Sequence, residues 1–138
     1  MNSRLLDSGF LYAFINDKES RHAEVSTILA AMRERVILPV PAITEVAYLV
    51  LRDLGVEALA GFLDELAETD FILETPVSED YKCAAEIIRK YNDANIDFVD
   101  AIIVAIGERL DITKILTVDR RHFGMFKPRH CAAFEITP

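Results

Sequence analysis

Four carboxylates occupy positions where the surrounding sequence is apolar. Asp7 and Asp119 each close a short apolar segment, and Glu45 is the only charge in the stretch VILPVPAITEVAYLVL. Asp100 lies in FVDAIIVAIGERL, which reads as a helix that is apolar nearly all round. An unpaired carboxylate there would be costly, so it needs a cation, hydrogen-bond donors or a water-filled cleft. Because hard divalent cations prefer carboxylate oxygen, a cluster of these residues would form a metal site.

Each carboxylate also has an ordinary structural explanation. Asp7 suits the N-cap of a following helix, and Asp97 suits the cap of the helix that contains Asp100. Asp97 lies one turn before Asp100 and could also share its site. Glu45 suits a helix N-terminus, where the macrodipole favours negative charge, and Asp119 could begin a turn. The metal-site hypothesis fails only if every one of these structural explanations is the full explanation for its carboxylate.

The rest of the chain indicates how the carboxylates are positioned. Short apolar runs alternate with longer helical stretches, which predicts an α/β fold with a central, mostly parallel, five-stranded sheet flanked by helices. Strands are expected at 4–6, 36–38, 71–74, 114–118 and 132–136, and helices at 9–15, 21–34, 42–53, 56–68, 78–92 and 98–110. In a doubly wound sheet, binding sites form beyond the carboxyl ends of parallel strands. Asp7 and Asp119 both fall at such ends, which links them in space.

Length and composition narrow the class of protein. The 138 residues, 51% of them hydrophobic, predict one globular domain spanning 1–138. No apolar run approaches the roughly 20 residues of a membrane span, and charges near the N-terminus argue against a signal peptide, so a cytoplasmic protein is expected. Cys83 and Cys131 are far apart and lack metal-ligand spacing, which predicts reduced thiols. Pro41 suits a helix start, and Ser78 is expected to cap the helix that follows it.

The charge distribution bears on a nucleic-acid partner. A net charge of −8 argues against one, but the segment 120–134 holds four Arg or Lys residues and no acid. Its cations could contact phosphates, or they could face solvent or pair with acids elsewhere. Phe123 and Phe126 could stack on bases, although core packing is the expected fate of both. His122 follows Asp119 closely enough to touch a substrate, but a surface or packing role is expected for it.

In their order along the chain, these segments resemble the PIN domain family, and in particular the VapC-like toxins of bacterial and archaeal toxin–antitoxin pairs. The matching pieces are LLDSGFLYAFIND, ITEV, DFVDAIIVAIGERL and ILTVDRRHF. The resemblance implies a single PIN-like domain that acts as a metal-dependent ribonuclease with Mg²⁺ or Mn²⁺. It further implies that Asp7 and Asp100 are the direct metal ligands, with Glu45 and Asp119 as partners and Asp97 as an additional acid.

The expected RNA contacts belong to hydroxyls near the acids and to the cationic segment. They are Ser8, Thr117, Arg120, Arg121, Lys127 and Arg129. The stretch AITEVAYLVLRDLGVEALAGFLDEL is more apolar than one buried stripe requires, which indicates a self-association face. Similarity to the toxins likewise implies a homodimer, and an antitoxin that inserts near the acidic cleft.

Other functional classes fit less well. A phosphatase of the haloacid dehalogenase type would need a second aspartate where this chain has Gly9, and a receiver domain would need a lysine after a late strand. No Gly-rich phosphate loop or dinucleotide fingerprint occurs. The more serious alternative is a non-catalytic PIN-like module that binds RNA or protein without cleaving it.

Overall fold

The structure is a computed structural model, and it describes residues 2–138 of the chain. One sheet holds β1 (Ser3–Leu6), β2 (Arg35–Pro39), β3 (Ile72–Glu74), β4 (Lys114–Leu116) and β5 (Glu135–Thr137). The helices in the described residues are α1 (Ser8–Ile15), α2 (His22–Ala31), α3 (Val40–Leu54), α4 (Val56–Ala67), α5 (Ser78–Lys90), α6 (Phe98–Leu110) and α7 (Arg120–Met125). The predicted α/β fold with a five-stranded sheet is confirmed, and the four strand pairings found in residues 2–138 are all parallel.

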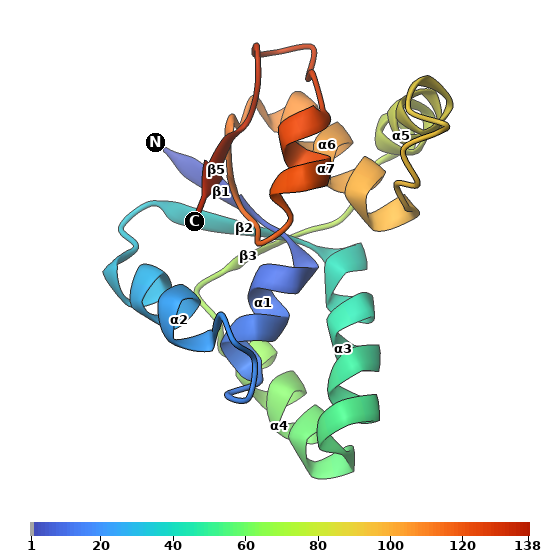
Figure 1. Ribbon diagram of the computed structural model, residues 1–138. Helices are drawn as coiled ribbons and strands as arrows, with labels where there is room; N and C mark the ends of the chain where they lie inside the picture. Colours follow the sequence, from blue (N-terminus) through green and yellow to red (C-terminus); the bar gives the residue numbers. More distant parts are fainter. Residues whose placement is uncertain (1) are drawn as a thin grey trace.

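The order of the strands reverses at the middle of the sheet, beside β1 (Figure 1). The order is β3-β2-β1-β4-β5, so the chain first moves outward from β1 to β3 and then returns to add β4 on the other side of β1. The carboxyl ends of β1 and β4 are therefore neighbours at the point where the strand order reverses. Ligands of open α/β sheets bind at such a switch point.

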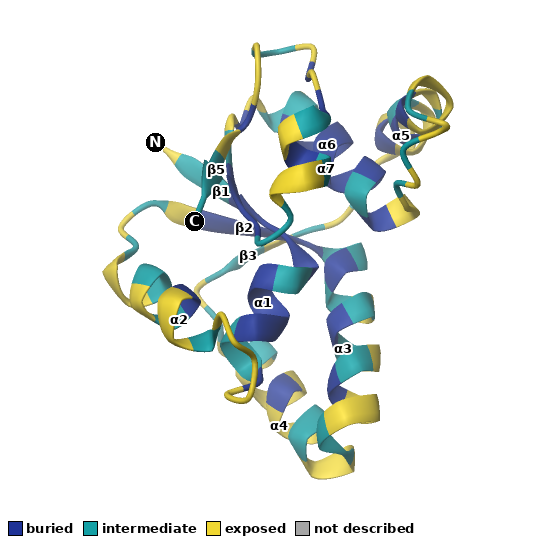
Figure 2. Cartoon of the chain, viewed as in Figure 1, coloured by how far each residue is buried: buried dark blue, intermediate teal, exposed yellow. Residues whose placement is uncertain are grey.

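Helix α6 is buried along most of its length and packs close to the sheet (Figure 2). Ile102, Ile103 and Ile106 are fully buried. The close approach depends on Gly107, since a Cβ atom there would lie 2.8 Å from Cδ1 of Leu5 in β1. The hydrophobic interior thus holds α6 at a fixed height above β1, and with it the first turn that carries Asp100.

An ion pair between a buried aspartate and a partly exposed arginine connects α5, α6 and β3. Asp80 in α5 is 1% exposed, and the Nε atom of Arg109 in α6 donates to its two carboxylate oxygens at 3.0 and 3.1 Å. Nη2 of Arg109 also donates to Glu74 at the end of β3, at 3.2 Å. Removing one partner of such a pair would leave an uncompensated buried charge, so the contacts hold α5, α6 and β3 together.

Several predicted boundaries are wrong, and each error has a local cause. The helix expected at 21–34 ends at Ala31, and the strand expected at 132–136 is Glu135–Thr137. Ser78 is the first residue of α5 and not its cap, so the helix begins one residue earlier than expected. Val77 is the N-cap, and its backbone N–H donates to the Asp80 side chain. Helix α7, which follows Asp119, was not among the expected elements.

Other expectations for individual residues are confirmed. Phe123 and Phe126 are 0% and 1% exposed and belong to the core. Cys83 and Cys131 are free cysteines. Pro41 lies in the first turn of α3, which begins at Val40. Within residues 2–138, no helix combines the length and the apolar character needed to cross a membrane.

Candidate active site

Asp7 lies at the centre of the switch point, directly after β1. Its backbone N–H donates to the carbonyl of Leu116 at 3.0 Å, which fixes the residue beside the end of β4. The Thr117 hydroxyl donates to Oδ2 of Asp7 at 2.7 Å, and the backbone N–H of Ser8 donates to Oδ1 at 2.8 Å. Asp7 is 4% exposed and Thr117 is fully buried. The expected N-cap role of Asp7 is also observed, because its side chain caps α1.

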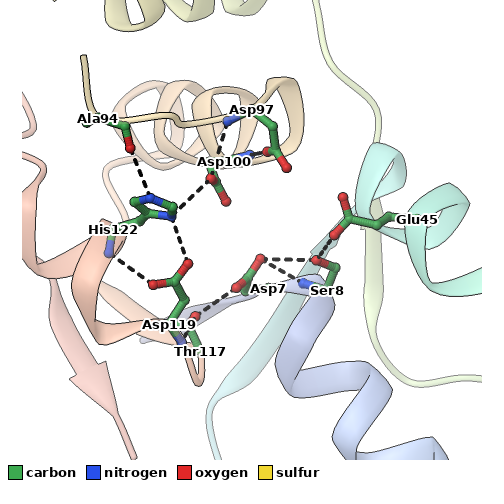
Figure 3. Close-up of polar contacts among 9 residues, drawn as sticks. All are labelled: Asp7, Ser8, Glu45, Ala94, Asp97, Asp100, Thr117, Asp119 and His122. Atoms are coloured by element: carbon green, nitrogen blue, oxygen red, sulfur yellow. Dashed lines mark hydrogen bonds and ion pairs between the residues drawn. The ribbon is translucent and has the colours of Figure 1, made fainter. Parts of the chain in front are cut away.

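Glu45 faces Asp7 from the second turn of α3 (Figure 3). The Ser8 hydroxyl donates to Oε1 of Glu45 and lies 3.4 Å from Oδ1 of Asp7. One hydroxyl therefore lies between the two carboxylates, and it holds Glu45 toward the site.

Asp97 and Asp100 form a reciprocal cap at the start of α6. The backbone N–H of Asp100 donates to Oδ1 of Asp97 at 2.9 Å, and the N–H of Asp97 donates to Oδ2 of Asp100 at 3.5 Å. The expected capping role of Asp97 is confirmed. Because the cap also fixes the first turn of α6, it orients the Asp100 carboxylate toward the space above Asp7 (Figure 3).

Asp119 is the N-cap of α7, and its side chain accepts a hydrogen bond from the backbone N–H of His122 at 3.0 Å. Nδ1 of His122 is 2.9 Å from Oδ2 of Asp119 and 3.6 Å from Oδ2 of Asp100. Nε2 of the same ring lies 3.2 Å from the Ala94 carbonyl oxygen. Both ring nitrogens therefore face oxygen atoms, one side of the ring toward α6 and α7 carboxylates and the other toward the backbone. His122 therefore connects the acids of α6 and α7, a role that the sequence did not indicate.

The electrostatics of the cluster show that its members affect one another. Burial raises the pKa of Asp7 to about 6; the hydrogen bonds from Thr117 and Ser8 oppose this shift, and repulsion from Glu45 and Asp119 adds to it. Burial likewise raises the pKa of Asp100 to about 7, and repulsion from Asp97 and Asp7 contributes. The four sequence-predicted acids thus face one region, since each of Glu45, Asp119 and Asp100 interacts electrostatically with Asp7.

The donor set fits a hard divalent cation, although the side chains do not yet converge on one point. Among the ion pairs of residues 2–138, none joins Asp7, Glu45, Asp100 or Asp119 to a lysine or arginine. In the same residues, no three His, Cys, Asp or Glu side chains lie close enough to hold a metal ion as they stand. Side-chain rotation would have to draw the carboxylates together, which is favourable only if a cation offsets their repulsion.

The arginine and lysine side chains predicted to bind RNA differ in their surroundings. Arg120 and Arg121 are exposed in the first turn of α7, next to Asp119. Lys127 is exposed beyond the end of α7. Arg129 is exposed, but its guanidinium contacts Glu86 in α5 and Glu108 in α6. Arg129 therefore lies in a separate ion-pair network, away from the acidic cluster, and the structure brings only the two arginines of α7 beside the acids.

Comparison with known proteins agrees with this architecture. Residues 4–125 match the PIN domain family. The chain belongs to the PIN domain family. Over 134 residues, which make up 97% of this chain and 99% of the relative, it is 31% identical to Ribonuclease VapC26 of Mycobacterium tuberculosis.

Solved structures show the same PIN domain fold. The crystal structure of VapC20 from Mycobacterium tuberculosis, a sarcin-ricin loop cleaving toxin, has a TM-score of 0.79 at 20% identity and covers 86% of this chain and 91% of that chain. A toxin-antitoxin complex from Klebsiella pneumoniae has a TM-score of 0.66 at 15% identity, with coverage of 89% and 92%.

Proposed function

We propose that this chain is a divalent-metal-dependent endoribonuclease and the toxin of a type II toxin–antitoxin pair. The single observation that carries the proposal is the environment of Asp7. It is a buried carboxylate at the switch point of the sheet, its pKa is raised to about 6, and its charged neighbours are other acids. A group of acids without a cation is costly to fold, so the arrangement is typical of a functional site. The 31% identity to a relative named a ribonuclease supports the same activity.

The acids divide into ligands and supporting groups. We assign Asp7 and Asp100 as the residues that would hold Mg²⁺ or Mn²⁺, with Glu45 and Asp119 completing the site and Asp97 orienting Asp100. A cation bound there would neutralise the approaching phosphodiester and lower the pKa of a water molecule that attacks phosphorus.

The remaining side chains position these acids and the substrate. The Thr117 hydroxyl holds one oxygen of Asp7, and the Ser8 hydroxyl holds Glu45. Both hydroxyls would also lie beside a phosphate placed at the acids. Arg120 and Arg121 would contact phosphates flanking the scissile bond, because they are exposed and adjacent to Asp119. Lys127 would extend this contact, whereas the ion pairs of Arg129 argue against a direct role for that residue.

Protein partners form part of the proposal. The toxin-antitoxin complex from Klebsiella pneumoniae shares the fold, which supports an antitoxin for this chain that would insert near the acidic cleft. A homodimer is supported by exposed apolar side chains on α3 and α4: Leu51, Val56 and Leu63 are 45%, 73% and 51% exposed. Light scattering tests the homodimer, for which we expect twice the 15.5 kDa mass of one chain.

The activity is tested by incubating the purified protein with Mn²⁺ and a mixed RNA substrate. We expect cleavage that EDTA abolishes and that Asp100→Asn lowers about a hundredfold or more, because even residues that only support a metal ligand typically cost 10- to 100-fold. Asp93→Asn is the matched control, since Asp93 is an exposed acid shortly before α6 with no part in the cluster. Metal-independent binding that leaves the RNA intact would instead identify the non-catalytic module.

A further inference from the structure

A pocket adjoins the acidic cluster, and apart from Glu45 its lining residues have no part in the proposed mechanism. The pocket, of about 560 Å³, opens beside Glu45, between α3, the segment 75–76, and the first turns of α5 and α6. Its lining is mostly apolar, and the lining residues with polar side-chain groups are Glu45, two threonines and two tyrosines: Thr44, Thr75, Tyr48 and Tyr81. This size and this mixture of groups are typical of pockets that bind small ligands.

Three aromatic side chains line the pocket and remain exposed. Tyr48, Tyr81 and Phe98 are 65%, 53% and 47% exposed. The rings of Tyr81 and Phe98 are parallel within 6°, with their centroids 6.3 Å apart. The Arg52 guanidinium lies 6.0 Å from the centre of the Tyr48 ring. Aromatic rings are rarely left this exposed in one place without a binding partner.

We propose that this pocket binds an unpaired base of the RNA strand whose phosphate lies at the acidic cluster. The inference rests on the proposed function. Flat aromatic rings stack on bases of any sequence, and an arginine plane can extend the stacking surface. Glu45 lines the pocket and also faces Asp7, so a base held there belongs to a nucleotide close to the scissile phosphate. The hydroxyls of Thr44 and Thr75 supply hydrogen-bonding groups for the base edge.

The size of the pocket favours a base over a second protein surface. Ten residues line it. Each side of a stable protein interface contributes roughly 20–30 residues. We therefore assign the pocket to RNA and treat a subunit interface as the competing outcome.

The experiment places 2-aminopurine, a fluorescent base whose emission falls on stacking, at successive positions of a short single-stranded RNA. The protein carries Asp119→Asn to slow cleavage, with or without a second substitution. We expect quenching at one position, its loss with Tyr81→Ala, and its return with Tyr81→Phe, because stacking requires only the ring. Ile88→Ala is the matched control, since Ile88 is an exposed apolar residue of the same helix outside the pocket.

Kinetics on the otherwise unmodified protein separate this inference from the proposed function. Tyr81→Ala should raise KM for RNA about tenfold with little change in kcat, since stacking on one aromatic side chain accounts for a change of this order.

If the protein cleaves RNA but Tyr81→Ala changes neither quenching nor KM, the inference is wrong and the proposed function stands. If quenching depends on Tyr81 while no RNA is cleaved, the pocket binds a base and the nuclease proposal fails. If light scattering shows that Tyr81→Ala only dissociates an oligomer, without any quenching, the pocket is a subunit interface and the inference is overturned.

Discussion

The Asp7 side chain combines burial with negative charge. Thr117 and Ser8 each donate one hydrogen bond to it, and these bonds offset only part of the free energy lost when the carboxylate leaves water. The remaining penalty appears as a pKa of about 6 in place of 3.8. The folded protein therefore binds this proton more tightly than the unfolded chain does, and ionising Asp7 opposes folding unless a cation is present.

This difference predicts a pH-dependent stability for the metal-free protein. Because the pKa of Asp7 is about 6 when folded and 3.8 in the reference state, the free energy of unfolding should fall as pH rises from about 4 to 6. Asp7→Asn removes the charge, so at pH 8 in EDTA we expect the variant to be more stable than the wild type by about 1–3 kcal/mol, with little difference near pH 4. Urea denaturation at both pH values measures this.

Two comparisons make that experiment decisive. Asp93→Asn, which changes an exposed acid outside the cluster, should show no gain at pH 8. A loss of stability for Asp7→Asn at pH 8 would mean that the folded protein prefers the ionised carboxylate, contrary to the electrostatics described above.

At the scale of single residues, the sequence identified the acids but not their connections. Glu45 and Asp100 were detectable because each is a charge in an apolar stretch. His122 was not, because its contact with Asp100 exists only after folding, and its spacing of three residues from Asp119 is a weak signal by itself. The ion pairs of Arg129, which the sequence predicts to contact RNA, are likewise not visible before folding. Its partners Glu86 and Glu108 lie 43 and 21 residues away in the sequence.

At the scale of elements, the position of Asp100 depends on how α6 packs against β1. The helix approaches the strand closely at Gly107, where a side chain would meet Leu5 at 2.8 Å. Gly61 in α4 provides the contrast, because a Cβ atom there would have no neighbour within 4 Å. Both glycines lie in α-helices, but only Gly107 is packed against another element.

We therefore expect opposite effects from the same substitution. Gly107→Ala should destabilise the protein by about 1–3 kcal/mol, because the extra methyl overpacks the contact between α6 and β1. Gly61→Ala should stabilise it by up to about 1 kcal/mol, since alanine is the better helix former. Urea denaturation of both variants measures the difference. Equal effects would show that α6 can move away from β1 without penalty.

The elements that the sequence predicted well are the long ones. Helices α3, α5 and α6 have 15, 13 and 13 residues, enough for an apolar periodicity to be seen. Helix α7 has only six residues and begins with three that are basic, so no pattern distinguishes it from a turn. Strand β5 has three residues, and its place in the sheet is decided by pairing with β4. The local sequence pattern does not indicate this pairing.

At the scale of the whole molecule, the site depends on the order of the strands. The alternation of strands and helices predicted a parallel sheet, and a general rule about strand ends linked Asp7 to Asp119. The order β3-β2-β1-β4-β5, which makes β1 and β4 neighbours, comes from tertiary packing and was not predictable from any one segment. The same topology places the exposed arginines of α7 beside the acids of an overall negative protein, which would allow an RNA strand to approach.

The most direct test of the metal site is anomalous diffraction from crystals of the protein grown with Mn²⁺. We predict a peak within about 2–2.5 Å of carboxylate oxygens of both Asp7 and Asp100, with Glu45 and Asp119 turned toward it. Crystals of Asp100→Asn under the same conditions should show a weaker peak or none. An empty acidic cluster at a saturating Mn²⁺ concentration, or a peak bound elsewhere on the molecule, would contradict the account.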